Sequence, residues 1–247
     1  MSESRQKLNP YGQGPYHWFL PYFYARKHER PLQLVAGRLT PTDMILDLGC
    51  GDGRHSALLA KWVKAVVGVD HQQLPLQFAR LLIQEGNVAL SRGDGARLPL
   101  ASGIFAGATC LDVIEHLPEA RVPELLKEVR RVLKPKGWVV FTTPNRASLH
   151  NRLWGHRVSQ KHYYEYTLPE LISMLAEAGF CIEHKTGIYL PPLLLRPYLE
   201  HYANVFPVKH LFRLLINAGA WAPGSSETLL LIARGTPGET SGRGASQ

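Results

Sequence analysis

The chain has 247 residues, of which 45% are hydrophobic and 19% charged, and its formal net charge is +8. This composition supplies enough apolar residues for a buried core and excludes an intrinsically disordered protein. Apolar runs stay well short of the roughly 18 residues that a membrane-spanning helix needs, and the polar first ten residues lack a secretory signal, so we expect a cytoplasmic protein.

Three segments lie outside the expected central domain of residues 41–234. Residues 1–40 contain an aromatic stretch (11–24) followed by a basic amphipathic one. We expect them to form a helical arm. Residues 190–223 are rich in Leu, Pro and aromatic residues and are expected to form a helical cap inserted before the last strand. Residues 235–247 are a polar Gly/Ser/Thr tail that we expect to be disordered.

Short apolar runs alternate with helix-like segments from Met44 onwards, which predicts an α/β fold with a mostly parallel sheet between layers of helices. The runs are MILDLG, AVVGVD, NVALSR, FAGATCLDV, WVVFTT, CIEHKTGIYL and TLLLIAR. One helix is expected around Leu125–Leu133, ending in the basic Lys134–Gly137 segment. Another opens with a capping box at Thr167 and closes at Gly179.

The three cysteines, Cys50, Cys110 and Cys181, are odd in number and lack a C-x-x-C spacing. This argues against a disulfide framework and against a zinc site. We expect three buried thiols.

The segment ILDLGCGDGRHSALLA joins a buried strand, ending at Asp47, to a helix through Gly49, Gly51 and Gly53. Glycines there let the backbone turn sharply and bring its amide groups close to a ligand. A nicotinamide dinucleotide site is less favoured, because Arg54 stands where its fingerprint has glycine, and no Gly-Lys-Ser/Thr follows to make a P-loop.

Two further acids follow the next two strands. Asp70 ends AVVGVD, where its carboxylate could accept hydrogen bonds from both hydroxyls of a ribose, and Asp94 follows the third strand, where it could accept an adenine amino group. Since ligands of open α/β sheets bind at the carboxyl edge of the strands, the three acids predict one binding edge.

Taken together, the motifs resemble those of the class I S-adenosylmethionine-dependent methyltransferases, especially the group that includes the ubiquinone-biosynthesis O-methyltransferases. The resemblance spans roughly residues 43–189 and rests on DLGCGDGR, VVGVD, GDGARLPL, CLDVIEHLPE, LKPKGWVVFTTPNR and HYYEYTLPEL. It implies a Rossmann-like seven-stranded sheet with an antiparallel last strand, and S-adenosylmethionine as cofactor. The cofactor-binding residues that it implies are Asp47, Gly49, Cys50, Gly51, Gly53, Asp70, His71, Asp94, Gly95, Ala96 and Asp112.

A hydroxyl acceptor needs a base, and His116 and His162 are the candidates, ahead of Glu115, because an imidazole exchanges protons near neutral pH. In an alternative, Asp112, Glu115 and His116 resemble a motif that is associated with a divalent ion in ubiquinone-type enzymes. Our main prediction has no metal.

The arm and the cap predict a hydrophobic or aromatic small-molecule acceptor, most simply methylated on oxygen. Methylation of nitrogen or carbon, a lipid-linked substrate at a membrane surface, RNA methylation and a non-catalytic scaffold stay open, as does a homodimer. Because the chain lacks an appended RNA-binding module, we expect no stable nucleic-acid partner. The acid-free basic segment 145–162 is either a solvated loop or a site for an anionic group.

Overall fold

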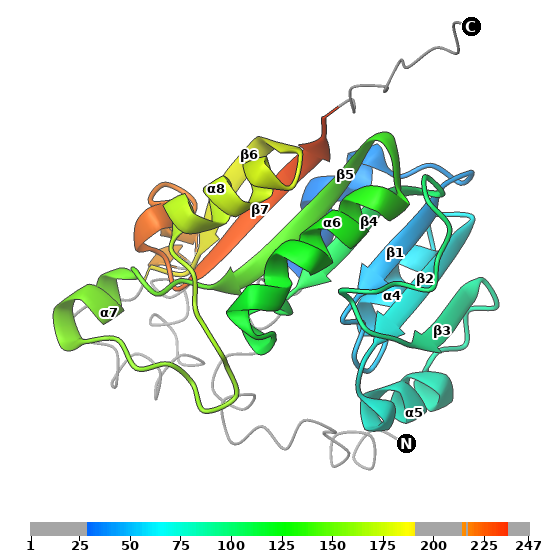
Figure 1. Ribbon diagram of the computed structural model, residues 1–247, viewed down its shortest axis with the longest axis horizontal. Helices are drawn as coiled ribbons and strands as arrows, with labels where there is room; N and C mark the ends of the chain where they lie inside the picture. Colours follow the sequence, from blue (N-terminus) through cyan, green and yellow to red (C-terminus); the bar gives the residue numbers. More distant parts are fainter. Residues whose placement is uncertain (1–28, 191–213, 216, 237–247) are drawn as a thin grey trace, which may run out of the picture.

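The computed structural model describes residues 29–190, 214, 215 and 217–236. Its centre is one seven-stranded sheet in the order β3-β2-β1-β4-β5-β7-β6 (Figure 1). The strands are β1 (Met44–Leu48), β2 (Ala65–Asp70), β3 (Val88–Arg92), β4 (Phe105–Leu111), β5 (Leu133–Pro144), β6 (Phe180–Ile188) and β7 (Thr228–Gly235). Neighbouring strands from β3 to β5 are parallel, and β7 pairs antiparallel with both β5 and β6. The predicted Rossmann-like sheet with an antiparallel last strand is confirmed.

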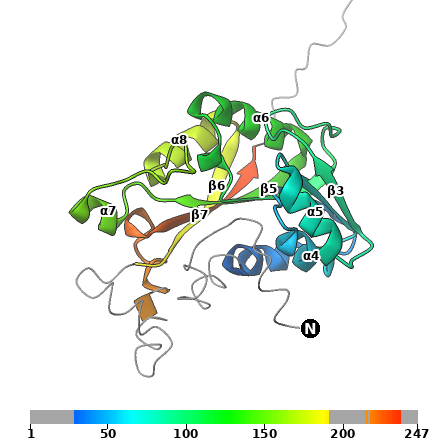
Figure 2. The ribbon, with the colours of Figure 1, turned by 90° about the horizontal axis from the view of Figure 1, so that it is seen from below.

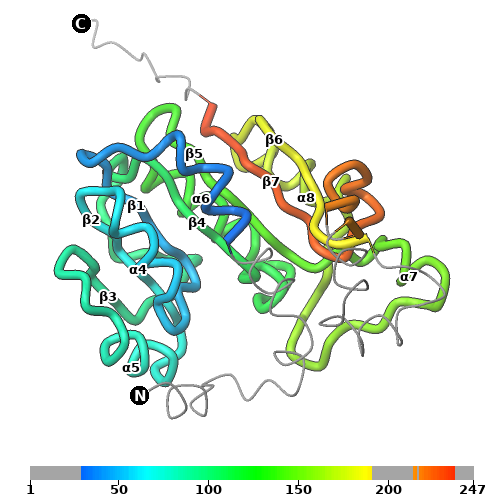
Figure 3. Tube along the Cα trace, turned by 180° about the vertical axis from the view of Figure 1, so that it is seen from behind, coloured from blue at the N-terminus to red at the C-terminus, as the bar shows by residue number. Residues whose placement is uncertain are grey.

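Helices cover both faces of the sheet, as Figure 2 shows edge-on. On one face lie α6 (Val122–Val132) and α8 (Leu168–Glu177). The other face carries a helix at residues 29–35 together with α4 (Arg54–Ala60), which Figure 3 shows from behind. Further helices are α5 (Gln73–Leu82) and α7 (Leu149–Trp154), and short 3-10 turns are η1 (Ala36–Arg38), η2 (Ile114–His116), η3 (Glu119–Arg121) and η4 (Pro223–Ser225).

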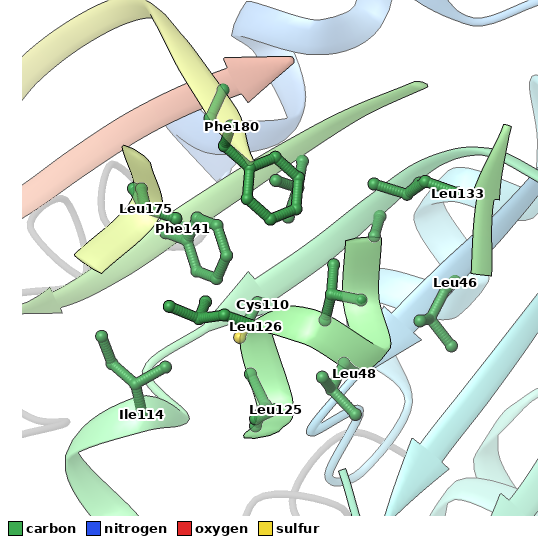
Figure 4. Packing of buried hydrophobic residues seen from close by; sticks show 14 of the residues in the cluster. Leu46, Leu48, Cys110, Ile114, Leu125, Leu126, Leu133, Phe141, Leu175 and Phe180 are labelled. Atoms are coloured by element: carbon green, nitrogen blue, oxygen red, sulfur yellow. The ribbon is translucent and has the colours of Figure 1, made fainter. Parts of the chain in front are cut away.

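The larger core cluster lies between the sheet and the α6–α8 layer (Figure 4). Leu125 and Leu126 of α6 and Phe141 of β5 are completely buried there. The apolar positions of α6 recur at helical spacing, so one face of the helix is buried, and α8 contributes Leu171 and Leu175 in the same way. This packing fixes the strand ends from which the candidate site is built.

Three expectations about local structure need correction. The thiol of Cys181 is exposed on β6, because alternate side chains of this sheet-edge strand point to solvent, whereas Cys50 and Cys110 are buried as expected. Residues 134–137 do not end a helix but belong to β5, since α6 stops at Val132. Gly235, placed in the tail by sequence, is the last residue of β7.

Much of the expected arm, cap and tail lies at residues 1–28, 191–213 and 237–247, outside the described residues. Within the expected arm, the structure describes residues 29–40, of which 29–35 form a helix. A search of the described helices finds none with the length and apolarity to cross a membrane.

Candidate active site

The loop between β1 and α4 turns tightly because its glycines adopt positive φ angles: +71° at Gly49, +55° at Gly51 and +76° at Gly53. Gly49 N–H donates to the Val69 carbonyl over 2.7 Å, which ties the loop to β2. A Cβ atom on Gly49 would lie 2.3 Å from Cγ2 of Val113, so a larger residue would not fit. The loop therefore packs directly against the segment that follows β4.

Asp47 occupies a different position from the one its sequence context suggests. It lies inside β1, which continues to Leu48, and it is only 2% exposed. Its carboxylate accepts hydrogen bonds from Ser56 Oγ and Thr109 Oγ1, each over 2.6 Å. These contacts join α4 and β4 to β1, so the carboxylate supports the glycine loop from within the core.

Asp70 ends β2 at the same edge of the sheet. Its Oδ2 accepts Gly51 N–H over 2.9 Å and its Oδ1 accepts Gln72 N–H over 2.8 Å. Because each carboxylate oxygen has two lone pairs, the group can still accept two hydroxyl protons. The side chain of His71 is largely exposed, with Nδ1 3.6 Å from Asp70 Oδ1.

Asp94 lies two residues beyond the end of β3, with its side chain about half exposed at 49%. Its Oδ2 accepts from Arg121 Nη2 over 2.7 Å, and its Oδ1 accepts from Ala96 N–H over 3.0 Å. These two hydrogen bonds lower the pKa of Asp94. Gly95 beside it packs under α6, because a Cβ there would lie 3.0 Å from Cδ1 of Leu125.

Asp112 follows β4 with a φ of +55°, which is unusual for a residue other than glycine. The strained turn is held by Thr142 of β5, whose Oγ1 donates to Asp112 Oδ1 over 3.1 Å and whose carbonyl accepts Asp112 N–H. Such strain is concentrated at functional sites. The turn leads from β4 into η2, and the next residue, Val113, packs against Gly49.

Both candidate bases come together, although they are far apart in sequence. The rings of His116, from η2, and His162, from the connection between α7 and α8, meet edge to face with centroids 4.9 Å apart. His116 Nδ1 is 2.9 Å from the Lys161 carbonyl. Burial lowers the pKa of His116, and the neighbouring His162 lowers it further.

Glu115 is also part of this cluster, and it is 1% exposed. Its Oε2 accepts a hydrogen bond from Thr143 Oγ1 of β5 over 3.0 Å. Glu115, His116 and His162 each offer a ligand atom within 4.8 Å of the others. Asp112 is not part of this group, so the ligand set of the sequence motif is not assembled as such, and the absence of a metal stays a prediction.

Sequence reasoning missed one acid of the site. Glu165, three residues after His162, is 7% exposed and contacts both His162 and His156. The H-x-x-E spacing was a signal for the first contact, since residues three apart often meet in a turn. His156 is nine residues away and comes close only because the loop folds back.

The basic segment 145–162 is less open to an anion than its composition suggests. Arg146 forms an ion pair with Glu170 of α8 and lies over the Tyr164 ring, 4.7 Å from its centroid. Asn145 is buried, and its Nδ2 donates to the carbonyl of Ser226 over 2.8 Å. These contacts anchor the segment to α8 and to the start of β7.

A family model described as a methyltransferase domain matches residues 16–185. A probable S-adenosylmethionine-dependent methyltransferase of Mycolicibacterium smegmatis is 29% identical to this chain. The match covers 68% of this chain and 63% of that relative, so the chain spans less than two thirds of the relative's length. A ubiquinone biosynthesis O-methyltransferase of Acinetobacter baumannii is 25% identical, with 68% of this chain and 76% of that protein covered. The methyltransferase in a complex with a methyltransferase activator of Haloferax volcanii has a TM-score of 0.63 at 18% identity, over 86% of this chain and 92% of that one. At 18% identity, the similarity to this last protein shows a shared fold alone.

Proposed function

This chain belongs to the S-adenosylmethionine-dependent methyltransferases with a methyltransferase domain, and from that premise we propose that it methylates an oxygen atom of a small hydrophobic or aromatic acceptor. The observation that carries the proposal is the pair His116 and His162, which meets just after β4, at the carboxyl edge of the sheet. An O–H acceptor needs such a base, and the A. baumannii relative is named as an O-methyltransferase.

The residues at the edge fit the cofactor. In our proposal the backbone of Gly49–Gly53 lies against the methionine part, and Asp70 accepts the two ribose hydroxyls with its remaining lone pairs. Asp94, Gly95 and Ala96 line the adenine end, and Asp112 faces the methionine end. Cys50, whose buried thiol has a raised pKa, and His71 complete the lining, while Asp47 acts through the loop that it supports.

The bound cofactor supplies a methyl group that is already electrophilic, since it is attached to a sulfonium. The protein therefore has to align the acceptor, exclude water and remove one proton. In our proposal a neutral imidazole of the His116–His162 pair accepts the acceptor's hydroxyl proton at Nε2.

A lipid-linked acceptor is a second candidate, favoured by exposed apolar side chains on α7 and on the connection that follows it. Leu153 is 54% exposed, Trp154 52% and Tyr163 66%, and Arg152 and Arg157 lie in the same acid-free segment. Such a combination suits an anionic bilayer surface. Co-sedimentation with vesicles that contain a quarter phosphatidylglycerol tests it: a Leu153→Ser/Trp154→Ser variant should lose binding, and unchanged binding would count against this surface.

The cofactor assignment is tested by titration calorimetry with S-adenosylhomocysteine, the demethylated product. Asp70→Ala should weaken binding at least about tenfold, because charge-assisted hydrogen bonds to both hydroxyls are lost. Asp43→Ala is the matched control, since Asp43 caps a turn with Thr40 before β1 begins, at the opposite end of the strand. Equal affinities of the two variants would contradict the ribose assignment.

The acceptor class is tested with methyl-labelled S-adenosylmethionine and a panel of phenols, catechols, primary amines and short RNAs. We expect label on phenols or catechols, and transfer to amines or RNA alone would overturn O-methylation. Dialysis against a chelator belongs to the same assay. Unchanged transfer after dialysis is expected, and loss that added Mg²⁺ restores would contradict the prediction of no metal.

A further inference from the structure

The connection between α7 and α8 carries a carboxylate that the proposed mechanism does not use. Both oxygens of the buried Glu165 are engaged: Oε1 with His162 Nδ1 over 2.7 Å, and Oε2 with His156 Nε2 over 2.8 Å. Ser159 N–H also points to Oε1, at 3.4 Å. The side chains of His162, His156 and Glu165 are 16%, 20% and 9% exposed, so this network is largely shielded from solvent.

Glu165 is ionised throughout the neutral pH range. Burial on its own raises the pKa of Glu165, but hydrogen bonds from His162, His156 and Ser159 bring it down to about 2. An ionised carboxylate only accepts hydrogen bonds, so His162 must donate its Nδ1 proton. With Nδ1 donating to Glu165, Nε2 is the ring nitrogen left to accept a proton on His162, which belongs to one cluster with His116 and Glu115.

His116 is held differently. Its Nδ1 faces the Lys161 carbonyl, a neutral acceptor, and its pKa is lowered by burial and by His162. A ring that takes up a proton becomes positively charged, and a buried negative charge at the opposite nitrogen stabilises that charge far better than a carbonyl does. Of the two histidines, His162 has that negative charge.

Resting on the proposed function, we propose that Glu165 is a positioning residue that acts through His162 and makes His162, rather than His116, the base. The acceptor O–H bond breaks and its proton goes to Nε2 of His162. Bound S-adenosylmethionine would supply the methyl group, its sulfur keeping the electron pair of the carbon–sulfur bond while the acceptor oxygen forms the new bond to carbon. His162 then passes its proton to water. His156 keeps the second oxygen of Glu165 in place.

The first test is a spectroscopic one that needs no acceptor. Nitrogen-15 shifts of the histidine rings, recorded with S-adenosylhomocysteine bound, should show His162 protonated at Nδ1 in the wild type and in Glu165→Gln, whose amide oxygen can still accept. Glu165→Ala should lose this preference. Glu183→Ala is the matched control, because Glu183 also accepts from two side chains, in this case Arg38 and Arg234, but on β6. An unchanged His162 tautomer in Glu165→Ala would overturn the proposal.

The second test is turnover with catechol as the probe acceptor. Glu165→Ala should lower kcat by about 100-fold with little change in KM for S-adenosylmethionine, and Glu165→Gln should recover part of the loss. In a His162→Ala background the Glu165→Ala change should cost nothing further, whereas in a His116→Ala background it should keep its full effect. If Glu165→Ala does not fold, Glu165→Gln replaces it in both backgrounds.

The outcomes separate the two proposals. Suppose that the wild type transfers label. The positioning role is then overturned, and the proposed function stands, if Glu165→Ala keeps the wild-type kcat. The same holds if Glu165→Ala lowers kcat by the same factor in the His162→Ala background as in the wild type. A wild type that binds S-adenosylhomocysteine but labels nothing in the acceptor panel overturns the proposed function, and the base with it.

Discussion

Gly49 shows how a single residue constrains the cofactor loop. Its φ of +71° strains any side chain, and a Cβ would also lie 2.3 Å from Val113. Gly103 has nearly the same φ, +70°, but nothing lies within 4 Å of its Cβ position. Gly103→Ala therefore measures the backbone strain alone, about 1 kcal/mol, and Gly49→Ala should cost about 3 kcal/mol because the clash adds to it.

Urea unfolding of the two variants measures this difference directly, and calorimetry with S-adenosylhomocysteine shows its effect on the site. Gly49→Ala should also weaken cofactor binding at least about tenfold, while Gly103→Ala leaves it unchanged. Equal losses of stability in both variants would mean that Val113 moves aside and that the loop is not constrained by close packing.

Single residues differ in how well their positions could be predicted. Asp70 is placed by local signals, because the apolar run AVVGVD ends at a polar residue and a strand ends there. Asp47 has the same local appearance, but its carboxylate is turned inward by Ser56 and Thr109, which come from two other elements. The role of a strand-end acid thus depends on partners that are distant in sequence.

At the scale of elements, α8 begins where the sequence predicts. Thr167 and Glu170 form the capping box, with Glu170 Oε2 accepting Thr167 N–H over 2.7 Å. Thr167→Ala should lower the free energy of unfolding by about 1 kcal/mol, because one backbone N–H at the helix start loses its acceptor. Thr167→Ser keeps the hydroxyl and is the control.

Urea denaturation followed by circular dichroism measures the change. Because Leu171 and Leu175 of α8 are completely buried, we expect one cooperative transition rather than separate melting of the helix. A loss as large in Thr167→Ser as in Thr167→Ala would show that the β-branched methyl group, not the hydrogen bond, stabilises this end.

Elements were easier to predict than their limits. All seven strands coincide with the expected runs. In the buried parallel strands β1 and β4 the runs are apolar because both faces are covered, whereas the edge strand β6 exposes several of its side chains. The sequence predicts the end of α6 within Lys134–Gly137, but the helix ends at Val132. Basic residues are as common at the start of a strand such as β5 as at the end of a helix, so they do not mark this boundary. The loop from α7 to α8 has no periodic pattern, so the contact between His116 and His162 could not be derived from it.

At the scale of the whole molecule, the site exists because parallel strands bring residues far apart in sequence to one edge. The loop after β1, the end of β2, the turn after β4 and the segment after β5 meet there. The sheet itself is stabilised mainly by its two apolar layers, while ionised carboxylates connect the loops around it. This division predicts how the molecule responds to acid.

Six described carboxylates have a pKa below the ordinary value: Asp52, Asp94, Glu128, Glu165, Glu170 and Glu183. Burial opposes ionisation in several of them, but hydrogen bonds from Arg, His or backbone N–H groups outweigh it. Since protons then bind the unfolded chain more readily, the stabilisation is complete above about pH 4.5 and is lost as the pH falls towards about 2.

Urea midpoints measured between pH 7 and pH 2.5 should therefore fall slightly below about pH 6.5, where the unfolded chain takes up a proton at His116 before the folded chain does, and fall steeply below about pH 5. Glu165 contributes at most about 3 kcal/mol of this loss, from its shift between 4.5 and about 2. In Glu165→Gln that part is absent at every pH, so its curve should converge with that of the wild type in acid.

Added salt should reduce the contribution of the half-exposed Asp94 more than that of the buried Glu165. Parallel curves for wild type and Glu165→Gln would show that Glu165 has the same affinity for protons in the folded and unfolded chain, and that the histidine contacts do not hold it ionised.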